Sequence, residues 1–354
     1  MTLRAELRLH RGEMRAANAR RSWTERAGAL VTLEAEGVRG VGEASPLPGY
    51  SPDTLEGARA TLEGVLGALD EQLVLEGPLR PALEAVGRLV DVHAQPSAAF
   101  ALETAVLDLW SQRRGMPAWR ALAEAFDRAP VARLPLASLV RLDAGPATAR
   151  EHAARAVDAG FQTLKGKIGR DLAAELESAA AVREAYPEVA LRFDANGTLP
   201  PPRATAVLTA LAGLRAELVE EPVGHTALLE GAPFPVPVAL DESLQGPEGA
   251  QRLERLADAA KVQAVVLKPM ALGGFVRAFA LAERRTLPSV VSHCFDGPIA
   301  WAASGALALA LGGEHAAGLG AHAGLGAWPA WAAPAFEGAT LHAMDAPGLG
   351  VEGA

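Results

Sequence analysis

The pattern of hydrophobic and polar positions changes character near residue 130. Upstream, residues 29–36 form a mostly apolar run and residues 40–43 a shorter one, with Gly37 between them. Two such runs around a glycine predict a β-hairpin. Residues 52–69 and 97–112 have the pattern of helices, with Ser51 and Ser97 as candidate N-caps. Residues 1–125 are therefore predicted to form an α+β unit.

Downstream, short apolar segments alternate with alanine-rich segments, which indicates strands alternating with helices. The expected strands cover the ranges 134–139, 163–168, 190–194, 216–220, 236–241, 264–268, 289–293 and 316–319. Helices are expected between them, for example over 148–159, 171–185, 203–214, 247–258 and 273–285.

Eight strands within about 190 residues favour a closed barrel of parallel strands, an α/β fold of the TIM-barrel kind. An open doubly wound sheet is the alternative, but no G-x-G-x-x-G motif follows the first strand. We assign residues 126–322 to the barrel. Residues 323–354, with Trp328, Pro329, Trp331 and Pro334, are predicted to form an irregular segment that packs back on the N-terminal unit.

Composition narrows the class of protein. The net charge of −9 argues against nucleic-acid binding, which needs a basic face. No apolar run approaches the 18 residues of a membrane span, and residues 1–21 lack the apolar core of a secretory signal. The single cysteine, Cys294, excludes an internal disulfide. We therefore expect a cytoplasmic protein without membrane or nucleic-acid partners, and a homo-oligomer stays open.

Lysine is scarce in this chain: only Lys165, Lys167, Lys261 and Lys268 occur, against 29 arginines. Arginine stays protonated, whereas the pKa of a lysine can be shifted until it exchanges protons. Three of the four lysines stand at the ends of expected strands. Lys261 lies in a connection between a helix and a strand, and we expect it to be an ordinary surface residue. The others are candidates for proton chemistry.

Charged residues end five successive strands of the predicted barrel. They are Lys167, Asp194, Glu220, Asp241 and Lys268, separated by 27, 26, 21 and 27 residues, which is one strand and helix each time. In a barrel this spacing gathers all five at the mouth formed by the carboxyl ends of the strands. Lys165, two residues before Lys167, points to the same face of its strand.

Three neighbouring carboxylates form an oxygen-rich site that suits Mg²⁺, with Mn²⁺ as the alternative. Two close ammonium groups lower each other's pKa, and a nearby metal ion lowers it further. A lysine in this setting can act as a base. The combination favours removal of a proton from the carbon next to a carboxylate, so a small carboxylate is the expected substrate.

The chain resembles the enolase superfamily in its muconate lactonising branch. The matching motifs are Lys165-Gly166-Lys167, Asp194-Ala195-Asn196, Glu220-Glu221-Pro222, Asp241-Glu242-Ser243 and Lys268-Pro269. The resemblance implies a modified (β/α)7β barrel with an N-terminal capping domain, completed by the C-terminal segment. Residues 42–51 resemble the capping loop of the o-succinylbenzoate synthases, which dehydrate 2-succinyl-6-hydroxy-2,4-cyclohexadiene-1-carboxylate in menaquinone biosynthesis.

The resemblance also implies roles for individual residues. Asp194, Glu220 and Asp241 would bind Mg²⁺. Lys167 would abstract the proton and then protonate the departing hydroxyl. The reaction would be a syn elimination of water, and the protein a hydro-lyase. Lys165 would tune Lys167, and Lys268 would stabilise the enediolate from the opposite face. The expected substrate contacts are Arg26 in a lid loop over 22–28, Ser45, Pro46 and Leu47 in the capping loop, and Arg192, Asn196, Ser292 and His293 at strand ends.

One segment departs from the family. After the seventh strand, where better-known members carry a Ser-rich stretch, residues 292–298 contain His293, Cys294 and Asp296. His293 and Asp296 either contact the substrate or are bystanders, and Cys294 is expected to be a small buried residue.

The same lysines could serve an N-succinylamino acid racemase or a dipeptide epimerase. Such epimerases often carry Asp-x-Asp after the eighth strand, where this chain has Gly318-Leu319-Gly320. A noncatalytic binding barrel is the remaining alternative.

Overall fold

The computed structural model of the protein describes residues 3–18, 21–230, 232–313, 315–328, 330–332 and 338–353, without the side chains of Leu229, Ala332 and Gly353. Pro329 and Pro334, which the sequence places in the return segment, lie outside the described residues.

The chain begins with a three-stranded antiparallel sheet in the order β1-β2-β3, formed by β1 (Arg4–Ala17), β2 (Ser22–Ala35) and β3 (Val38–Ala44). Glu36 and Gly37 connect β2 to β3 with φ angles of 53° and 79°. Two positive φ angles match the twist of a tight hairpin, which explains the glycine. The predicted hairpin is confirmed.

One strand of this sheet was not predicted, and one predicted loop was wrong. β1 was not foreseen, because its Arg- and Glu-rich sequence is largely exposed and its strand form comes from pairing with β2 along most of its length. The expected lid loop over 22–28 is the first half of β2, in which Trp23 and Arg26 are buried.

The helices of the N-terminal part are α1 (Leu55–Val65), η1 (Leu66–Ala68), α2 (Glu71–Glu76), α3 (Leu79–Leu89), α4 (Pro96–Arg113) and α5 (Ala118–Ala125). Neither expected N-cap is one. Thr54 caps α1, whereas Ser51 Oγ accepts a hydrogen bond from the backbone N–H of Leu47. Ser97 lies inside α4, and its Oγ donates to Asp53 Oδ2 at 2.5 Å.

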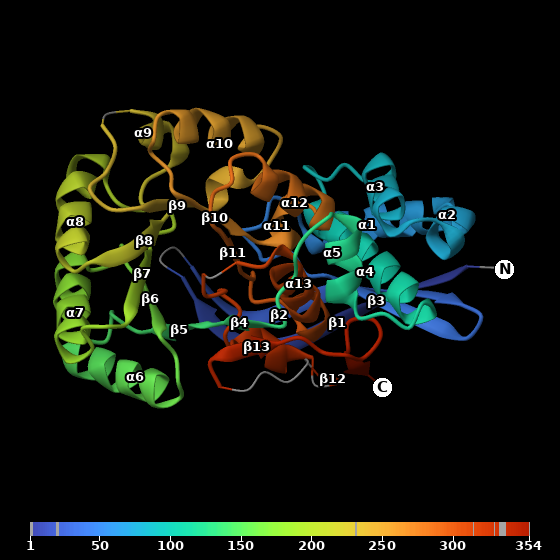
Figure 1. Ribbon diagram of the computed structural model, residues 1–354, viewed down its shortest axis with the longest axis horizontal. Coiled ribbons are helices and arrows are strands. Elements are labelled where there is room, and N and C mark those ends of the chain that lie inside the picture. Colours follow the sequence, from blue (N-terminus) through green and yellow to red (C-terminus); the bar gives the residue numbers. More distant parts are fainter. Residues whose placement is uncertain are drawn as a thin grey trace.

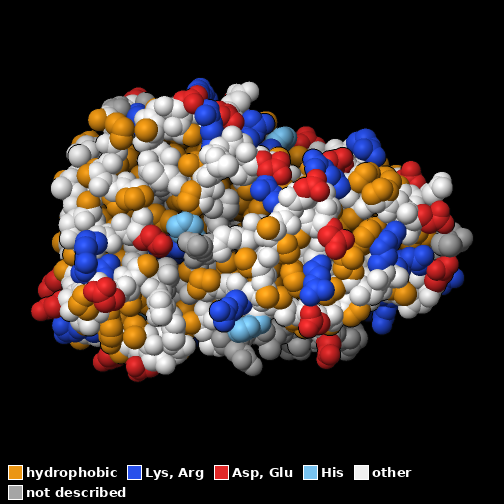
Figure 2. Space-filling view, in the orientation of Figure 1, with side chains coloured by type: hydrophobic (Ala, Val, Ile, Leu, Met, Phe, Trp, Pro, Cys, Tyr) orange, Lys and Arg blue, Asp and Glu red, His pale blue; other side chains and the backbone are white. Residues whose placement is uncertain are grey.

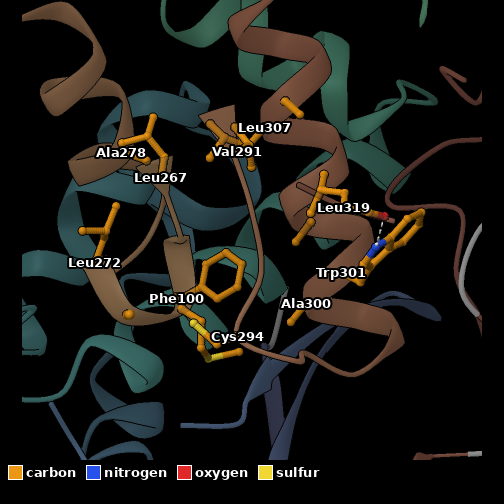
Figure 3. Close-up of a cluster of buried hydrophobic side chains, with 14 of the residues drawn as sticks. Phe100, Leu267, Leu272, Ala278, Val291, Cys294, Ala300, Trp301, Leu307 and Leu319 are labelled. Atoms are coloured by element: carbon orange, nitrogen blue, oxygen red, sulfur yellow. Dashed lines mark hydrogen bonds between the residues drawn. The ribbon is translucent and has the colours of Figure 1, made fainter. Parts of the chain in front are cut away.

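Helix α4 is buried along most of its length, as its apolar sequence predicts. It lies against β3, so closely that a Cβ on Gly42 would come within 1.9 Å of the carbonyl oxygen of Ala101. On its other side, the ring of Phe100 contacts Phe275 edge to face, with 5.4 Å between the ring centroids. Figure 3 shows Phe100 beside barrel residues such as Leu267 and Cys294, so the two parts of the chain share one core.

The barrel is a parallel sheet of seven strands in the order β11-β10-β9-β8-β7-β6-β5. They are β5 (Ala137–Val140), β6 (Thr163–Lys167), β7 (Ala190–Asp194), β8 (Ala216–Glu220), β9 (Val238–Leu240), β10 (Ala264–Leu267) and β11 (Ser289–Val291). The expected eighth strand, 316–319, is present only as two parallel bridges, from Ala317 to Leu136 and from Gly318 to Ser292. These bridges join β11 to β5 and close the barrel.

The barrel helices are α6 (Pro146–Asp158), α7 (Leu172–Ala185), α8 (Pro201–Gly213), α9 (His225–Leu229), η2 (Glu242–Leu244), α10 (Gly249–Asp258), α11 (Pro269–Leu272), α12 (Phe275–Glu283) and α13 (Pro298–Leu311). In Figure 1, α6, α7 and α8 stand along one side of the barrel, and α9 and α10 cover another. The sheet β1–β3 and the helices α1 to α4 form the other half of the molecule, which matches the predicted capping arrangement.

The C-terminal segment contacts both halves. It contains η3 (Ala323–Ala327), β12 (Trp331–Ala332), β13 (Thr340–His342) and β14 (Glu352–Gly353), and β13 pairs with β4 (Arg133–Pro135). Further along, the backbone N–H of Leu349 donates to Asp108 Oδ1 on α4 at 2.9 Å. The predicted domain limits at 125 and 322 stay a prediction.

In the part of the chain that the structure describes, no helix combines the length and apolar content needed to cross a bilayer. Figure 2 shows basic and acidic side chains interspersed over the visible face.

Glu103 on α4 is a buried carboxyl that joins the two halves. Its Oε2 accepts hydrogen bonds from the backbone N–H groups of Phe275 and Val276 at the start of α12. Burial raises the pKa of Glu103 from 4.5 to about 8, and these hydrogen bonds offset only part of that effect. Between pH 4.5 and 8 the folded state therefore holds a proton that the unfolded state has released.

The protonated Glu103 side chain therefore makes its full contribution to the free energy of unfolding below pH 4.5. That contribution is lost as the pH rises through 8. We expect Glu103→Gln, which keeps the acceptor oxygen but does not titrate, to gain stability relative to the wild type by about 1 kcal/mol per pH unit across this window. Urea denaturation at several pH values measures the difference. The exposed Glu84→Gln on α3 is the control, and parallel curves for wild type and Glu103→Gln would contradict the prediction.

Candidate active site

The carboxyl ends of the barrel strands open into a cavity of about 400 Å³. Its lining includes Lys165, Lys167, Asp194, Asn196 and Lys268, so the spacing of charges along the chain predicted the gathering of these residues. The capping half contributes Leu47 and Tyr50, and the segment after β11 contributes Ser292, His293 and Phe295.

Glu220 and Asp241 end the next strands of the sheet and are 1% and 2% exposed, beneath the cavity lining. Lys165 Nζ bridges two carboxylates, at 3.1 Å from Asp194 Oδ2 and 2.5 Å from Glu220 Oε2. Lys268 Nζ lies 2.5 Å from Asp241 Oδ2. The three carboxylates are thus balanced by two ammonium groups.

Lys167 differs from the other two site lysines. No hydrogen bond or ion pair engages its Nζ among the described residues, and its Nζ lies 6.0 Å from the centroid of the Phe295 ring. Burial lowers the pKa of Lys167; the charge of Asp194 opposes this effect, and the charges of Lys165 and Lys268 add to it. For Lys165, burial acts the same way, but Asp194 and Glu220 outweigh it and raise its pKa. Lys167 is therefore the site lysine whose pKa is shifted toward the range in which a lysine can act as a base.

The carboxylates suit a hard cation by chemistry, since Asp194, Glu220 and Asp241 offer buried oxygen ligands on adjacent strand ends. As the side chains lie, no group of three acidic, histidine or cysteine residues among those described converges on one metal position. The carboxylate oxygens of Asp194, Glu220 and Asp241 instead form ion pairs with Lys165 and Lys268. The donor set fits Mg²⁺, and binding would require these carboxylates to exchange ammonium contacts for the ion.

Glu221 and Asn196 support the three carboxylates. Glu221 Oε2 accepts from the backbone N–H of Asp241 at 2.9 Å, which orients the strand end that carries Asp241. Asn196 binds on two sides: its backbone N–H donates to Asp194 Oδ1 at 3.0 Å, and its side-chain amide donates to Glu242 Oε1 at 3.0 Å. Asn196, predicted to contact substrate, thus also connects the ends of β7 and β9.

Tyr50 is a site residue that the sequence reasoning did not single out. Its hydroxyl donates to Asp241 Oδ1 at 2.9 Å and accepts from Lys268 Nζ at 2.9 Å. Tyrosine occurs only twice in the chain, and this one lies in the segment 42–51 that resembles a capping loop. The scarcity of tyrosine could have identified Tyr50, as the scarcity of lysine identified the three site lysines.

We expect Tyr50→Phe to lower kcat/KM by about 10-fold, because a hydrogen bond to a charged group contributes about 1.5–3 kcal/mol. Steady-state kinetics measure the effect. Tyr186→Phe, which changes the other tyrosine outside the cavity, is the matched control. Equal losses in both variants would argue against a role for the Tyr50 hydroxyl in the site.

The remaining predicted substrate contacts divide into two groups. Leu47, Asn196, Ser292 and His293 line the cavity. Arg26, Ser45 and Pro46 are buried and absent from the lining, and so is Arg192, which pairs with Glu217 Oε2 at 2.5 Å and the carbonyl of Ala316 at 2.6 Å. Arg192 lies two residues before Asp194 on β7, one layer deeper in the barrel.

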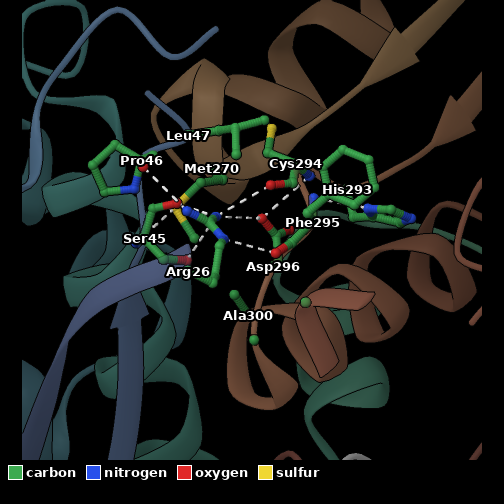
Figure 4. Close-up of polar contacts among 12 residues, drawn as sticks. Arg26, Ser45, Pro46, Leu47, Met270, His293, Cys294, Phe295, Asp296 and Ala300 are labelled. Carbon is green, nitrogen blue, oxygen red and sulfur yellow. Dashed lines mark hydrogen bonds and ion pairs between the residues drawn. The ribbon is translucent and has the colours of Figure 1, made fainter. Parts of the chain in front are cut away.

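Arg26 is better described as a clamp beneath the cavity than as part of a lid. Its guanidinium donates to the carbonyls of Ser45 and Pro46 in the capping half, and to those of Cys294 and Phe295 after β11. Figure 4 shows these groups converging on Arg26, with Asp296 beside it at 3.7 Å. Asp296 is not part of the cavity lining. The Arg26 clamp connects the two loops that carry Leu47 and Phe295.

The expectations for two other residues have clear outcomes. Lys261 is buried, not a surface residue: it is 6% exposed, and its Nζ donates to the carbonyl of Glu230 at 3.0 Å. Cys294 lines the cavity but is 3% exposed, and burial raises the pKa of its thiol well above the usual range. A protonated thiol is a poor nucleophile, which agrees with its prediction as a small buried residue.

Family models match both halves of the chain. The model described as "Enolase C-terminal domain-like" matches residues 148–353, and "MenC, N-terminal domain" matches residues 16–109. An N-succinylamino acid racemase of Thermus thermophilus is 34% identical over 278 residues, covering 75% of this chain and 70% of that protein. An o-succinylbenzoate synthase of Desulfotalea psychrophila is 30% identical over 276 residues, covering 70% and 72%.

Solved structures have the same fold. The dipeptide epimerase from Enterococcus faecalis V583, complexed with Mg and the dipeptide L-Leu-L-Tyr, is 25% identical with a TM-score of 0.81, covering 99% of each chain. The L-Ala-D/L-Glu epimerase from Bacillus subtilis is 23% identical with a TM-score of 0.84, covering 99% of this chain and 98% of that one. The second likeness supports the fold alone.

Proposed function

Because this chain belongs to the enolase superfamily, we propose that it is a magnesium-dependent o-succinylbenzoate synthase in menaquinone biosynthesis. In this proposal Asp194, Glu220 and Asp241 hold the metal ion and Lys167 is the general base. The observation that supports the chemistry most directly is Lys167 itself: a buried amine with a lowered pKa, without an ion-pair partner among the described residues, in the same cavity as Asp194.

A divalent cation held by the three carboxylates would bind the substrate carboxylate and offset the negative charge that develops when the neighbouring carbon loses its proton. Lys167 Nζ takes that proton. The electron pair left on carbon then forms the ring double bond as the bond to the leaving hydroxyl breaks. Lys167 returns its proton to the departing oxygen, so that water leaves and the amine is neutral again. Lys268, which lines the same cavity, faces the developing charge as a cation.

Dehydration is favoured by the N-terminal half. The MenC match covers residues 16–109, which include β2, β3 and the loop with Leu47 and Tyr50. That loop meets the barrel cavity through the Tyr50 hydroxyl. An o-succinylbenzoate synthase of Thermobifida fusca is 38% identical over 173 residues, about half of each protein. These likenesses support the dehydratase assignment.

N-succinylamino acid racemisation is the second candidate. It is favoured by Lys268, a second lysine in the same cavity as Lys167, and by the likeness to the Thermus racemase. A racemase needs both lysines to exchange protons with the same carbon. In the present arrangement Lys268 is ion-paired to Asp241 and hydrogen-bonded to Tyr50, which suits a stationary cation better than a base.

The deciding experiment supplies the purified protein with Mg²⁺ and, in separate reactions, the cyclohexadiene carboxylate or an L-N-succinylamino acid. Loss of the diene absorbance with formation of o-succinylbenzoate is the expected result. Racemisation without dehydration would replace the first proposal by the second. Lys268→Arg separates the two roles, because it removes racemisation while leaving Lys167 able to exchange the substrate proton with deuterated solvent.

A further inference from the structure

His293 lies on the cavity wall opposite the first metal-binding strand. It follows β11, and in the closed barrel β11 is four strands from β7, which ends in Asp194. Its side chain lines the cavity beside Phe295, whose ring faces Lys167. Figure 4 shows His293 and Phe295 together on the segment that the Arg26 clamp holds. A substrate with its carboxylate at the acidic side therefore extends its remote end toward His293.

The hydrogen bonds of His293 define which ring nitrogen carries the proton. The backbone N–H of Phe295 donates to His293 Nδ1 at 3.0 Å, so Nδ1 is an acceptor. In a neutral imidazole the other nitrogen is then the donor. The proton of His293 is therefore on Nε2.

A second histidine fixes the plane of this ring. His322 stacks on His293 with 3.7 Å between ring centroids and 23° between planes, and its Nδ1 accepts from the backbone N–H of Gly324 at 3.2 Å. Two stacked rings that both accept a hydrogen bond at Nδ1 are both neutral Nε2–H tautomers. Burial also lowers the pKa of both rings, that of His322 to about 3.

The Nε2–H of His293 has no partner among the described residues, and it is not among the buried unpaired atoms, so it is open to the cavity. A donor that loses its water on ligand binding is left unpaired, at a cost in affinity, unless the ligand supplies an acceptor. A ring held by a backbone hydrogen bond and by stacking has also lost most of its rotational freedom, so it donates in one direction.

We propose that His293 is a substrate-binding residue whose Nε2–H donates a hydrogen bond to a carbonyl or carboxylate oxygen of the acyl chain remote from the reacting carbon. Phe295, through its backbone N–H, and His322, through stacking, are positioning residues for this donor. The assignment rests on the proposed function for the orientation of the substrate. It selects substrates with an oxygen-bearing acyl chain, a class to which both succinyl substrates belong.

The test uses binding, so that it does not depend on turnover. o-Succinylbenzoate and 2-butanoylbenzoate, in which a methyl group replaces the terminal carboxylate, are titrated calorimetrically into wild type, His293→Leu and His293→Gln in the presence of Mg²⁺. His293→Leu is expected to weaken binding of o-succinylbenzoate by about 10-fold, and His293→Gln, whose amide N–H reaches a similar position, to restore most of it. His225→Gln, on the exposed helix α9, is the matched control.

The second ligand identifies the oxygen. A loss with His293→Leu that persists for 2-butanoylbenzoate assigns the bond to the ketone carbonyl, and a loss confined to o-succinylbenzoate assigns it to the carboxylate. Equal affinities in wild type, Leu and Gln variants would overturn the proposal. So would ¹⁵N spectra of the wild-type imidazoles, should they place the His293 proton on Nδ1. Failure of the wild type to bind either ligand would count against the proposed function instead, and the spectra would still test the donor.

Discussion

Replacing Lys167 by glutamine is expected to lower kcat by about three to four orders of magnitude, the upper end of what a general base contributes. Lys167 is the site lysine that no acidic group holds among the described residues, and burial lowers its pKa. Glutamine keeps the approximate length and polarity of the side chain but cannot accept the proton. Pre-steady-state and steady-state kinetics with the substrate established by the assays above measure the loss.

Lys261→Arg is the matched control, since it changes the one lysine whose Nζ contacts Glu230 outside the cavity. It should retain kcat within a few-fold. In the wild type, kcat should rise with pH as Lys167 loses its proton and level off below the ordinary lysine pKa of 10.5. A Lys167→Gln variant with more than a tenth of wild-type activity would show that another group removes the proton.

The second large effect is expected at the carboxylates. Asp241→Asn should reduce kcat/KM by about 10³-fold or more at millimolar Mg²⁺, because it removes one anionic ligand and leaves Lys268 without its ion-pair partner. It should also abolish the rise in Tm that Mg²⁺ gives the wild type. Binding to the folded state alone stabilises by about 2.7 kcal/mol at 100 times the dissociation constant, a shift of several degrees.

Scanning calorimetry with and without Mg²⁺ measures this shift. Asp258→Asn, which alters an exposed carboxylate paired with Arg285, should respond to Mg²⁺ as the wild type does. If Asp241→Asn keeps the full Mg²⁺-dependent shift, the ion binds elsewhere and the assignment of Asp241 fails.

The site was accessible from sequence to the extent that it depends on periodicity. A parallel barrel returns to the same edge once per strand and helix, so residues one such unit apart gather there. Lys165, Lys167, Asp194 and Lys268 line one cavity for this reason. The preference for lysine at these positions was visible because arginine replaces it nearly everywhere else.

Contacts between distant segments were not accessible in this way. Tyr50 meets Asp241 across 191 positions of sequence, and Arg26 meets the carbonyl of Phe295 across 269. Neither contact leaves a local pattern. Arg26 was expected in a lid because residues 22–28 resemble a lid loop of the family, yet its side chain is buried and donates five hydrogen bonds to the two loops that carry Ser45 and Phe295.

The sequence by itself determined the alternation of strands and helices and the order of charges along the strand ends, and it suggested the kind of chemistry that is proposed above. These follow from backbone periodicity and side-chain chemistry, which are local. Only the tertiary structure decided which site lysine lacks an ion pair among the described residues, which loop residues reach the cavity, and which nitrogen of His293 carries a proton. Those properties depend on burial and on partners brought together by folding, and a pKa or a tautomer is set by its surroundings and not by the residue type.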